Sequence, residues 1–280
     1  MNFRLPHIIQ CCLLALLATS CISEPTAQET MAVIDGWMDS DGYPVVVFTA
    51  SMQPGEGEQS VADKLIRWGK ITVSDGDSTV ILTGGPDRNY FPPYKYFTYK
   101  LKGKPGKTYT LDAEFDDLHA TAVCTMPFPT PIDSISLKPI EGEDSLRAAT
   151  LHFTAPQDTP AYYYLTIRER GKGSRAWPAM MGTASATRPG ESVSIPVFHA
   201  KNQLDSLNYI PQLKLGQELE INLCRVTEEV YNFWTSYDNA VMFGGSQFLV
   251  NTNGDLGGNI RGGLGVWSVQ GTSRVYLTVE

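Results

Sequence analysis

Apolar and polar residues alternate over many short segments, and this feature most constrains the fold. Apolar side chains occupy every second position over residues 109–115, and they do so again over 118–126. A period of two places alternate side chains on opposite faces of a β-strand, so that one face is buried. Because similar segments recur from residue 31 to the end of the chain, the sequence predicts an all-β, mainly antiparallel fold.

A proline-rich segment is expected to divide this fold into two parts. Residues 127–131 hold three prolines, which deny backbone donors and favour an extended connection. We therefore predict an immunoglobulin- or transthyretin-like sandwich over 31–126, a linker over 127–131 and a second β domain over 132–280.

The second β domain is expected to carry one amphipathic helix near residues 228–242. Its apolar residues recur at helical spacing, Thr227 is a candidate N-cap, and two glutamates open the first turn. We expect the apolar stripe to pack on the second sheet. The glycine-rich residues 251–265 precede a β-like segment and no helix, so they predict close backbone approach in a tight connection and no phosphate loop.

The beginning of the chain predicts export and lipid attachment. Arg4 precedes an apolar run over residues 8–18, which is shorter than the ~20 residues that cross a bilayer. Small residues then lead to Cys21, an order that resembles the lipobox of bacterial lipoproteins. We expect a signal peptide over 1–20, an acylated Cys21 and a polar leader over 21–30. An ordinary signal peptide with a chance cysteine is the alternative.

The expected location is the outer membrane, reached through the lipid on Cys21. Residue 22 is isoleucine, so no aspartate follows the cysteine to retain the protein in the inner membrane. Which side of the outer membrane the protein faces stays open. In an oxidising compartment Cys124 and Cys224 could form a disulfide, but two separate buried thiols fit the strand pattern better.

Composition and motifs argue against several functions. The net charge of −8, without a basic stripe, argues against nucleic-acid binding. Known nucleophile, metalloprotease and phosphate-loop motifs are missing, and the histidines after the leader, His119, His152 and His199, are scattered. Aspartate–glycine pairs fit turns better than a calcium site. We therefore expect a non-catalytic protein that holds neither a cofactor nor a metal. A hydrolase is the weaker alternative.

An aromatic stretch supplies the candidate binding surface. Residues 89–97 hold five aromatic side chains around two consecutive prolines, which impose an extended path. Exposed aromatic residues on a rigid loop can anchor a partner protein, peptide or sugar, although they could equally cap the open end of the sandwich. The candidate residues are Tyr90, Phe91, Tyr94, Tyr96, Trp177 and Trp267.

The chain resembles a family of Bacteroidota lipoproteins known as domain of unknown function 4249. The segments that carry the resemblance are residues 65–76, 89–94, 106–111, 230–234 and 258–265. The resemblance implies no catalytic residues. It implies an accessory or ligand-binding role beside a TonB-dependent nutrient transporter, and a structural or adhesive envelope component is the alternative.

Overall fold

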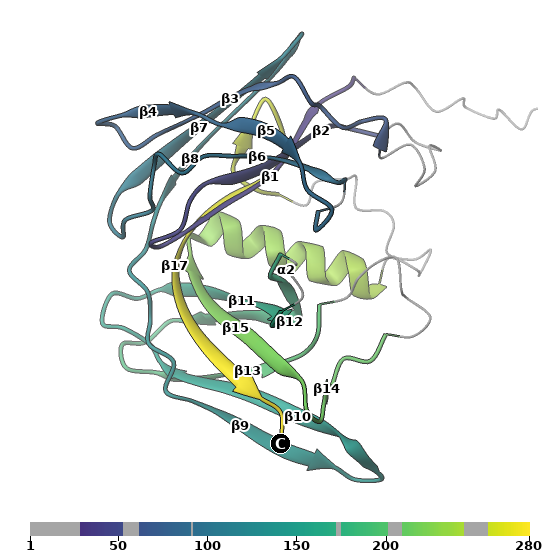
Figure 1. Cartoon of the computed structure of the whole chain (residues 1–280). Helices are drawn as coiled ribbons and strands as arrows, with labels where there is room; N and C mark the ends of the chain where they lie inside the picture. Colours follow the sequence, from purple (N-terminus) through teal and green to yellow (C-terminus); the bar gives the residue numbers. More distant parts are fainter. Residues whose placement is uncertain (1–28, 53–61, 91, 172–174, 201–208, 244–256) are drawn as a thin grey trace, which may run out of the picture.

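The computed structural model describes residues 29–52, 62–90, 92–171, 175–200, 209–243 and 257–280. The all-β expectation is confirmed, because three sheets make up most of the described chain (Figure 1). The expected signal peptide and the acylation site at Cys21 lie outside the described residues. No helix of the described part is long and apolar enough to span a bilayer.

The largest sheet joins strands from both ends of the chain. Its order is β12-β11-β15-β17-β1-β2-β6-β5, and its centre is a parallel pair between β1 and β17. All the other pairs in this sheet are antiparallel. Its strands are β1 (Ala32–Asp39), β2 (Val45–Ala50), β5 (Thr83–Pro86), β6 (Tyr94–Phe97), β11 (Ala161–Glu169), β12 (Trp177–Ala186), β15 (Glu218–Val226) and β17 (Gly263–Thr278).

Two smaller sheets accompany the two halves of the large one. A five-stranded sheet contains β3 (Lys70–Ser74), β4 (Thr79–Ile81), β7 (Thr108–Phe115), β8 (Leu118–Thr125) and β16 (Ile260–Arg261). A four-stranded sheet contains β9 (Ser134–Ile140), β10 (Glu143–Thr154), β13 (Ser192–Val197) and β14 (Leu213–Lys214). Two separate hydrophobic cores result: one holds side chains of β1, β2, β3, β7 and β8, the other those of β10, β11, β13 and β15. The predicted alternation in β7 and β8 is confirmed by their burial.

The sixteen-residue strand β17 links the two cores. Its first half pairs with β1, and its second half pairs with β15. The proline-rich residues 127–131 do connect strands of different sheets, β8 and β9, yet β16 and β17 return to the N-terminal strands. The division into two domains, 31–126 and 132–280, stays a prediction.

Close backbone approach explains the glycine-rich sequence before β17. Gly265 has φ +102°, and a Cβ atom there would lie 2.0 Å from the carbonyl oxygen of Ile34 on β1. Gly262 has φ +74°, and a Cβ atom there would lie 2.4 Å from the carbonyl oxygen of His119 on β8. Only glycine combines this conformation with this contact. The expected close approach is confirmed for residues 257–265, and the rest of the segment lies outside the described residues.

The helix predicted near 228–242 is confirmed as α2 (Glu228–Phe243). Its side chains Val230, Phe233 and Trp234 are buried, and the helix contacts β11, β12 and β17 of the large sheet. Figure 1 shows α2 lying along this part of the sheet. The carbonyl oxygen of Thr227 accepts the first helical hydrogen bond, but the hydroxyl of Thr227 finds no partner among the described residues. Thr227 therefore occupies the N-cap position, as predicted, but its hydroxyl does not cap the helix.

The two cysteines are separate buried thiols, which confirms the preferred alternative. Cys124 lies in the N-terminal core, where burial raises the pKa of its thiol to about 11. Cys224 is fully buried on β15, and burial likewise raises the pKa of its thiol. Both groups therefore stay protonated at neutral pH and behave as small apolar side chains.

Candidate functional site

A cavity of about 370 Å³ lies beside α2 and over one face of the large sheet. Polar and charged side chains dominate its lining, together with four aromatic ones. The floor, formed by strands of the sheet, includes Thr166, Arg168, Glu220, Asn222, Gln270 and Arg274. The walls include Trp37, Asp39, Asp87, Tyr90, Lys95, Tyr164, Arg175 and Trp234.

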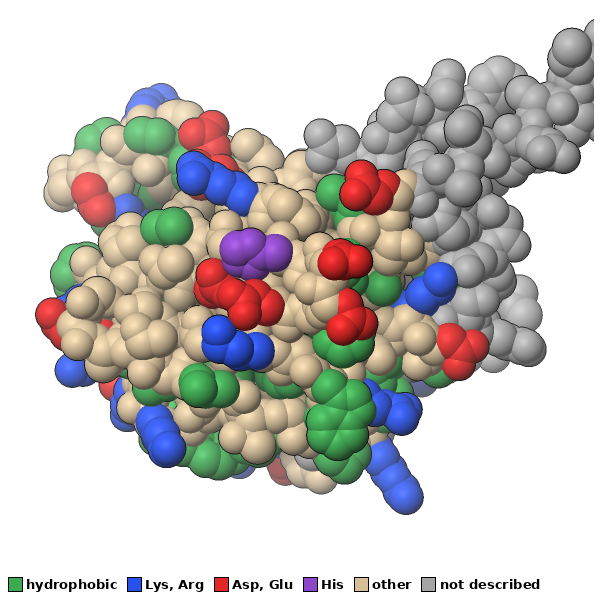
Figure 2. Space-filling view, turned by 90° about the horizontal axis from the view of Figure 1, so that it is seen from above, with side chains coloured by type: hydrophobic (Ala, Val, Ile, Leu, Met, Phe, Trp, Pro, Cys, Tyr) green, Lys and Arg blue, Asp and Glu red, His purple; other side chains and the backbone are tan. Residues whose placement is uncertain are grey.

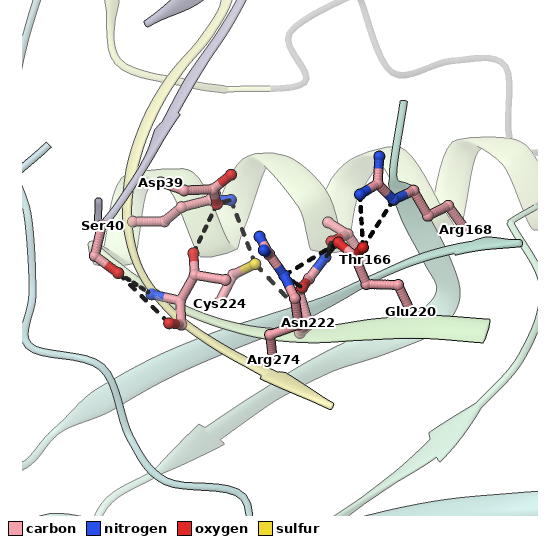
Figure 3. Close-up of polar contacts among 10 residues, drawn as sticks. Asp39, Ser40, Thr166, Arg168, Glu220, Asn222, Cys224 and Arg274 are labelled. Carbon is pink, nitrogen blue, oxygen red and sulfur yellow. Dashed lines mark hydrogen bonds and ion pairs between the residues drawn. The ribbon is translucent and has the colours of Figure 1, made fainter. Parts of the chain in front are cut away.

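Strand register gathers the polar side chains of the floor. Glu220 and Asn222 are two residues apart on β15 and therefore share a face. They pair with Arg168 and Thr166 on β11, and Asn222 pairs with Arg274 on β17. Figure 3 shows the resulting row, with Asp39 at one end and Arg168 at the other.

Glu220 is the buried carboxylate at the centre of the floor. Its side chain is 4% exposed, and Arg168 donates to its Oε2 atom through Nε at 3.0 Å and Nη2 at 2.6 Å. The Nε atom of Arg274 lies 3.1 Å from Oε1 of Glu220 and also donates to Oδ1 of Asn222 at 2.9 Å. A buried carboxylate is tolerated only with such partners, which also fix both guanidinium groups in place.

Asp39 forms the opposite end of the row. Its Oδ1 atom accepts hydrogen bonds from Nε2 of Gln270 and Oγ1 of Thr272, both at 2.7 Å. Gln270 in turn accepts from the hydroxyls of Ser268 and Tyr164. Burial raises the pKa of the Tyr164 phenol well above its ordinary value, so Tyr164 remains a donor. Neutral groups therefore hold the Asp39 carboxylate.

Arg175 crosses the wall between two tryptophans. Its Cζ atom lies 3.7 Å from the ring centroid of Trp37 and 4.7 Å from that of Trp177. Its Nη2 atom donates to Oδ1 of Asp35 at 3.0 Å, and Nη1 bonds the other carboxylate oxygen. Burial alone would lower the pKa of Arg175, but the charge of Asp35 and its hydrogen bonds raise it. The guanidinium therefore stays charged and stacked.

A second ion pair completes the wall. Nζ of Lys95 lies 2.8 Å from Oδ2 of Asp87 and 4.6 Å from the ring centroid of Tyr90. Burial alone would raise the pKa of Asp87, but hydrogen bonds from Lys95 and Asn89 lower that pKa overall. The pair is therefore charged at neutral pH.

Two of the expected binding residues lie at this site. Tyr90 lines the cavity and stacks on Trp37, with ring centroids 5.8 Å apart. Trp177 lies behind Arg175 at the edge strand β12, and 36% of its surface is exposed. The sequence signal for both was the presence of aromatic residues near loops, and the structure adds the charged partners.

The other expected binding residues do not belong to the site. Tyr96 is buried. Its hydroxyl donates to the carbonyl oxygen of Ile66 and accepts a hydrogen bond from the Gly69 N–H group, both at 2.9 Å. Trp267 is fully buried in the core. Both predictions of surface exposure are wrong. Tyr94 is half-buried and bonds the backbone of residue 67, and Phe91 lies outside the described residues.

Sequence reasoning missed the charged residues of the cavity. The alternation of Leu219, Ile221 and Leu223 with polar residues over 218–224 predicts a half-buried strand whose polar face holds Glu220 and Asn222. In the structure β15 is buried along almost its whole length. The sequence signal for Glu220 and Asn222 is the row of polar side chains on one face of 218–224, which indicates a polar surface where neighbouring strands also carry polar residues. Nothing local in the sequence links this strand to Asp39 or Arg175.

The outer face of the five-stranded sheet is a weaker candidate, because the hollow of about 310 Å³ beside its Phe115 has only two charged lining residues, Asp63 and Arg67. Figure 2 shows this face from above, with acidic and basic side chains mixed and hydrophobic ones scattered. Asp112, Glu114 and His119 hold ligand atoms within 4.8 Å of one another, but Lys70 already binds Glu114 at 3.1 Å. We therefore assign the candidate site to the cavity.

α2 also carries a carboxyl group that titrates near neutral pH. Burial raises the pKa of Asp238 from 3.8 to about 6, despite a hydrogen bond from the Met181 backbone. The folded protein therefore binds more protons than the unfolded chain between these values, and this group makes folding less stable as the pH rises through 4 to 6.

Asp238→Asn is expected to remove this contribution. The variant should be more stable than the wild type at pH 7.5, and the difference should vanish below about pH 3, where the carboxyl group is protonated in both states. Urea unfolding of both proteins across this range measures it. A difference independent of pH would show that Asp238 does not titrate in this way.

Two solved structures align with this chain at low similarity. A solved structure described as a cytokine receptor complex aligns over 88% of this chain and 95% of its own, with TM-score 0.25 and 8% identity. The BSP domain of a biofilm-associated protein aligns over 71% and 27%, with TM-score 0.21 and 11% identity. These scores are too low to bear on fold or function.

Sequence comparison is more informative about the family than about the activity. Comparison with curated proteins finds no similar sequence. The family profile described as "Domain of unknown function (DUF4249)" matches residues 22–274, which is most of the chain. This protein therefore belongs to the DUF4249 family.

Proposed function

We propose that this protein is a lipid-anchored binding protein of the outer membrane, which holds a small polar ligand as an accessory subunit of a TonB-dependent transporter. The observation that carries the binding role is the cavity. It places charged and amide side chains on a hydrogen-bonded sheet, an arrangement that orients a ligand without rearrangement.

A binding role fits the cavity better than catalysis does. None of the described residues that line the cavity is histidine, serine or cysteine. Glu220 is bound by two arginines, and Asp39 is bound by an amide and a hydroxyl group. Both oxygens of Glu220 are occupied by the arginines, so this carboxylate is suited to recognition, because a general base needs a free oxygen and a pKa near the pH of the reaction.

The lipid anchor is supported by the sequence around Cys21. We expect Cys21→Ser to abolish acylation, because the thiol is the attachment point. Palmitate labelling and membrane fractionation measure this. Cys12→Ser is the matched control, since this cysteine lies within the expected signal peptide, and it should be acylated normally. Labelling of the Cys21→Ser protein would contradict the anchor.

The transporter association can be tested by affinity purification. The tagged, acylated protein is purified from outer membranes in mild detergent, and co-purifying proteins are identified by mass spectrometry. A TonB-dependent transporter at equal stoichiometry supports the proposal. Recovery of the protein alone contradicts the accessory role, and recovery as a self-associated polymer favours a structural or adhesive component.

A further inference from the structure

Most charges at the cavity are paired within the protein. Arg175 is bound by Asp35, and Lys95 is bound by Asp87. Glu220 accepts two hydrogen bonds from Arg168 on one of its oxygens. Because Arg274 shares the same carboxylate, two guanidinium groups face one negative charge at this end of the floor.

Arg274 keeps donors available for a ligand. Its contacts to Glu220 and Asn222 both use Nε, and among the described residues its two terminal amino groups have no hydrogen-bond partner. The side chain lines the cavity and is 44% exposed. A guanidinium with this free edge is a good partner for a carboxylate, which it can bind through two parallel hydrogen bonds.

Asp39 has a carboxylate oxygen that is available to a ligand. Both of its hydrogen bonds are accepted by Oδ1, so that Oδ2 has no partner among the described residues. Neither donor carries a charge, and Asp39 lines the same cavity as Arg274. An ammonium group in the cavity would supply the missing positive partner.

The two groups are spaced for a short ligand. Asp39 is bonded to Thr272, which precedes Arg274 by two residues on β17. Two residues of a strand span about 7 Å between Cα atoms, so Thr272, which holds Asp39, and Arg274 lie about this far apart on one face. A single amino acid residue extends by about 3.5 Å, so an amino acid or a short peptide with its hydrogen bonds fits this spacing.

A buried donor strengthens the assignment. The Trp234 side chain lines the cavity, only 7% of the residue is exposed, and its Nε1 atom has no acceptor among the described residues. A buried N–H group without an acceptor is costly, and a ligand carbonyl or carboxylate oxygen would satisfy it.

The aromatic rings are less suited to a sugar. Trp37 already stacks with Tyr90 and with the guanidinium of Arg175. Trp234 stacks on Tyr164, with ring centroids 5.3 Å apart. Sugars are usually held on open aromatic faces, whereas these faces are used within the protein, so the polar groups determine the ligand.

We propose that the cavity binds a small zwitterion, an amino acid or a short peptide, with its ammonium group at Asp39 and its carboxylate at Arg274. This assignment rests on the proposed binding function and names its ligand class. The Nε1 atom of Trp234 donates to an oxygen of the ligand.

Isothermal titration calorimetry with the purified mature protein tests the assignment. The probes are the common amino acids, glycyl dipeptides, and the N-acetylated and C-amidated forms of any compound that binds. We expect binding of at least one zwitterion, and loss of either charge should weaken it about tenfold or more. A preference for free amino acids or for dipeptides identifies the source, and either supports the proposal.

Two variants connect each ligand charge to its residue. Asp39→Asn should lose the preference for the free ligand over its N-acetylated form, and Arg274→Gln should lose the preference over the amide. Each variant should retain the other preference, which a general loss of folding cannot produce. Asp77→Asn and Arg188→Gln remove exposed charges outside the cavity and should bind as the wild type does.

The possible failures are distinguishable. Equal binding of free and blocked ligands, or binding of neutral saccharides in place of zwitterions, overturns this assignment and leaves a binding protein. If neither zwitterions nor saccharides bind, the ligand assignment and the cavity's binding role are both overturned, whatever co-purifies from the membrane.

Discussion

Replacing Gly265 by alanine is expected to lower the free energy of unfolding by at least about 3 kcal/mol. The residue has φ +102°, a conformation that residues with a Cβ atom rarely adopt. The added Cβ would also lie 2.0 Å from the carbonyl oxygen of Ile34, so β1 would have to move away from β17. The strain and the lost pairing therefore act together.

Gly142→Ala separates these two causes. Gly142 lies between β9 and β10 with φ +80°, and nothing lies within 4 Å of the position a Cβ would occupy. Its replacement should cost only the conformational strain, about 1–2 kcal/mol. Urea unfolding of both variants measures the difference. An equal loss in the two would show that the β1–β17 contact adds nothing.

The same strand connects stability to the candidate site. β17 pairs with β1 from Gly263 onward, contributes Gln270 and Arg274 to the cavity floor, and ends paired with β15. The Asp39 carboxylate reaches this floor only because β1 pairs with β17. The cavity is therefore a product of a pairing between the two ends of the described chain.

Local patterns in the sequence were sufficient for the elements of the fold. A period of two located strands such as β7 and β8, and a helical period located α2 within a residue of its observed end. Those signals depend on neighbouring residues, whose spacing fixes which side chains share a face. The parallel pairing of residues 32–39 with 263–270 has no local signature, because it brings together segments more than 200 residues apart.

The site could be predicted only in small part for the same reason. Tyr90 was identified from its aromatic surroundings, but Arg175 and Asp35 meet through tertiary contacts alone. The polar face of β15 was recognised as polar, and a strand pattern of this kind usually indicates contact with solvent. In the structure Glu220 and Asn222 are instead buried by neighbouring side chains, and both line the cavity. Periodicity identifies a face and leaves open what covers it.

Trp267→Ala should cost about 3–5 kcal/mol, the largest loss expected for a core side chain. Trp267 is fully buried, and its ring lies against Gly36 of β1, where a Cβ would come within 2.8 Å of its Cε3 atom. Asn259 holds both backbone polar groups of Trp267 at 2.9 Å, so the backbone has little freedom to collapse into the space left by the ring. Most of the cavity created by the substitution should therefore persist.

Trp68→Ala provides the matched control, because it removes the same side chain from a position that is 87% exposed. We expect a change within about 0.5 kcal/mol, as for most surface substitutions. Trp267→Phe should be milder than Trp267→Ala: it retains a ring, and the indole Nε1 of Trp267 has no partner among the described residues to lose. Chemical unfolding of the three variants ranks them. A loss at Trp267 as small as that at Trp68 would contradict the burial assigned to β17 and with it the arrangement of the cavity floor.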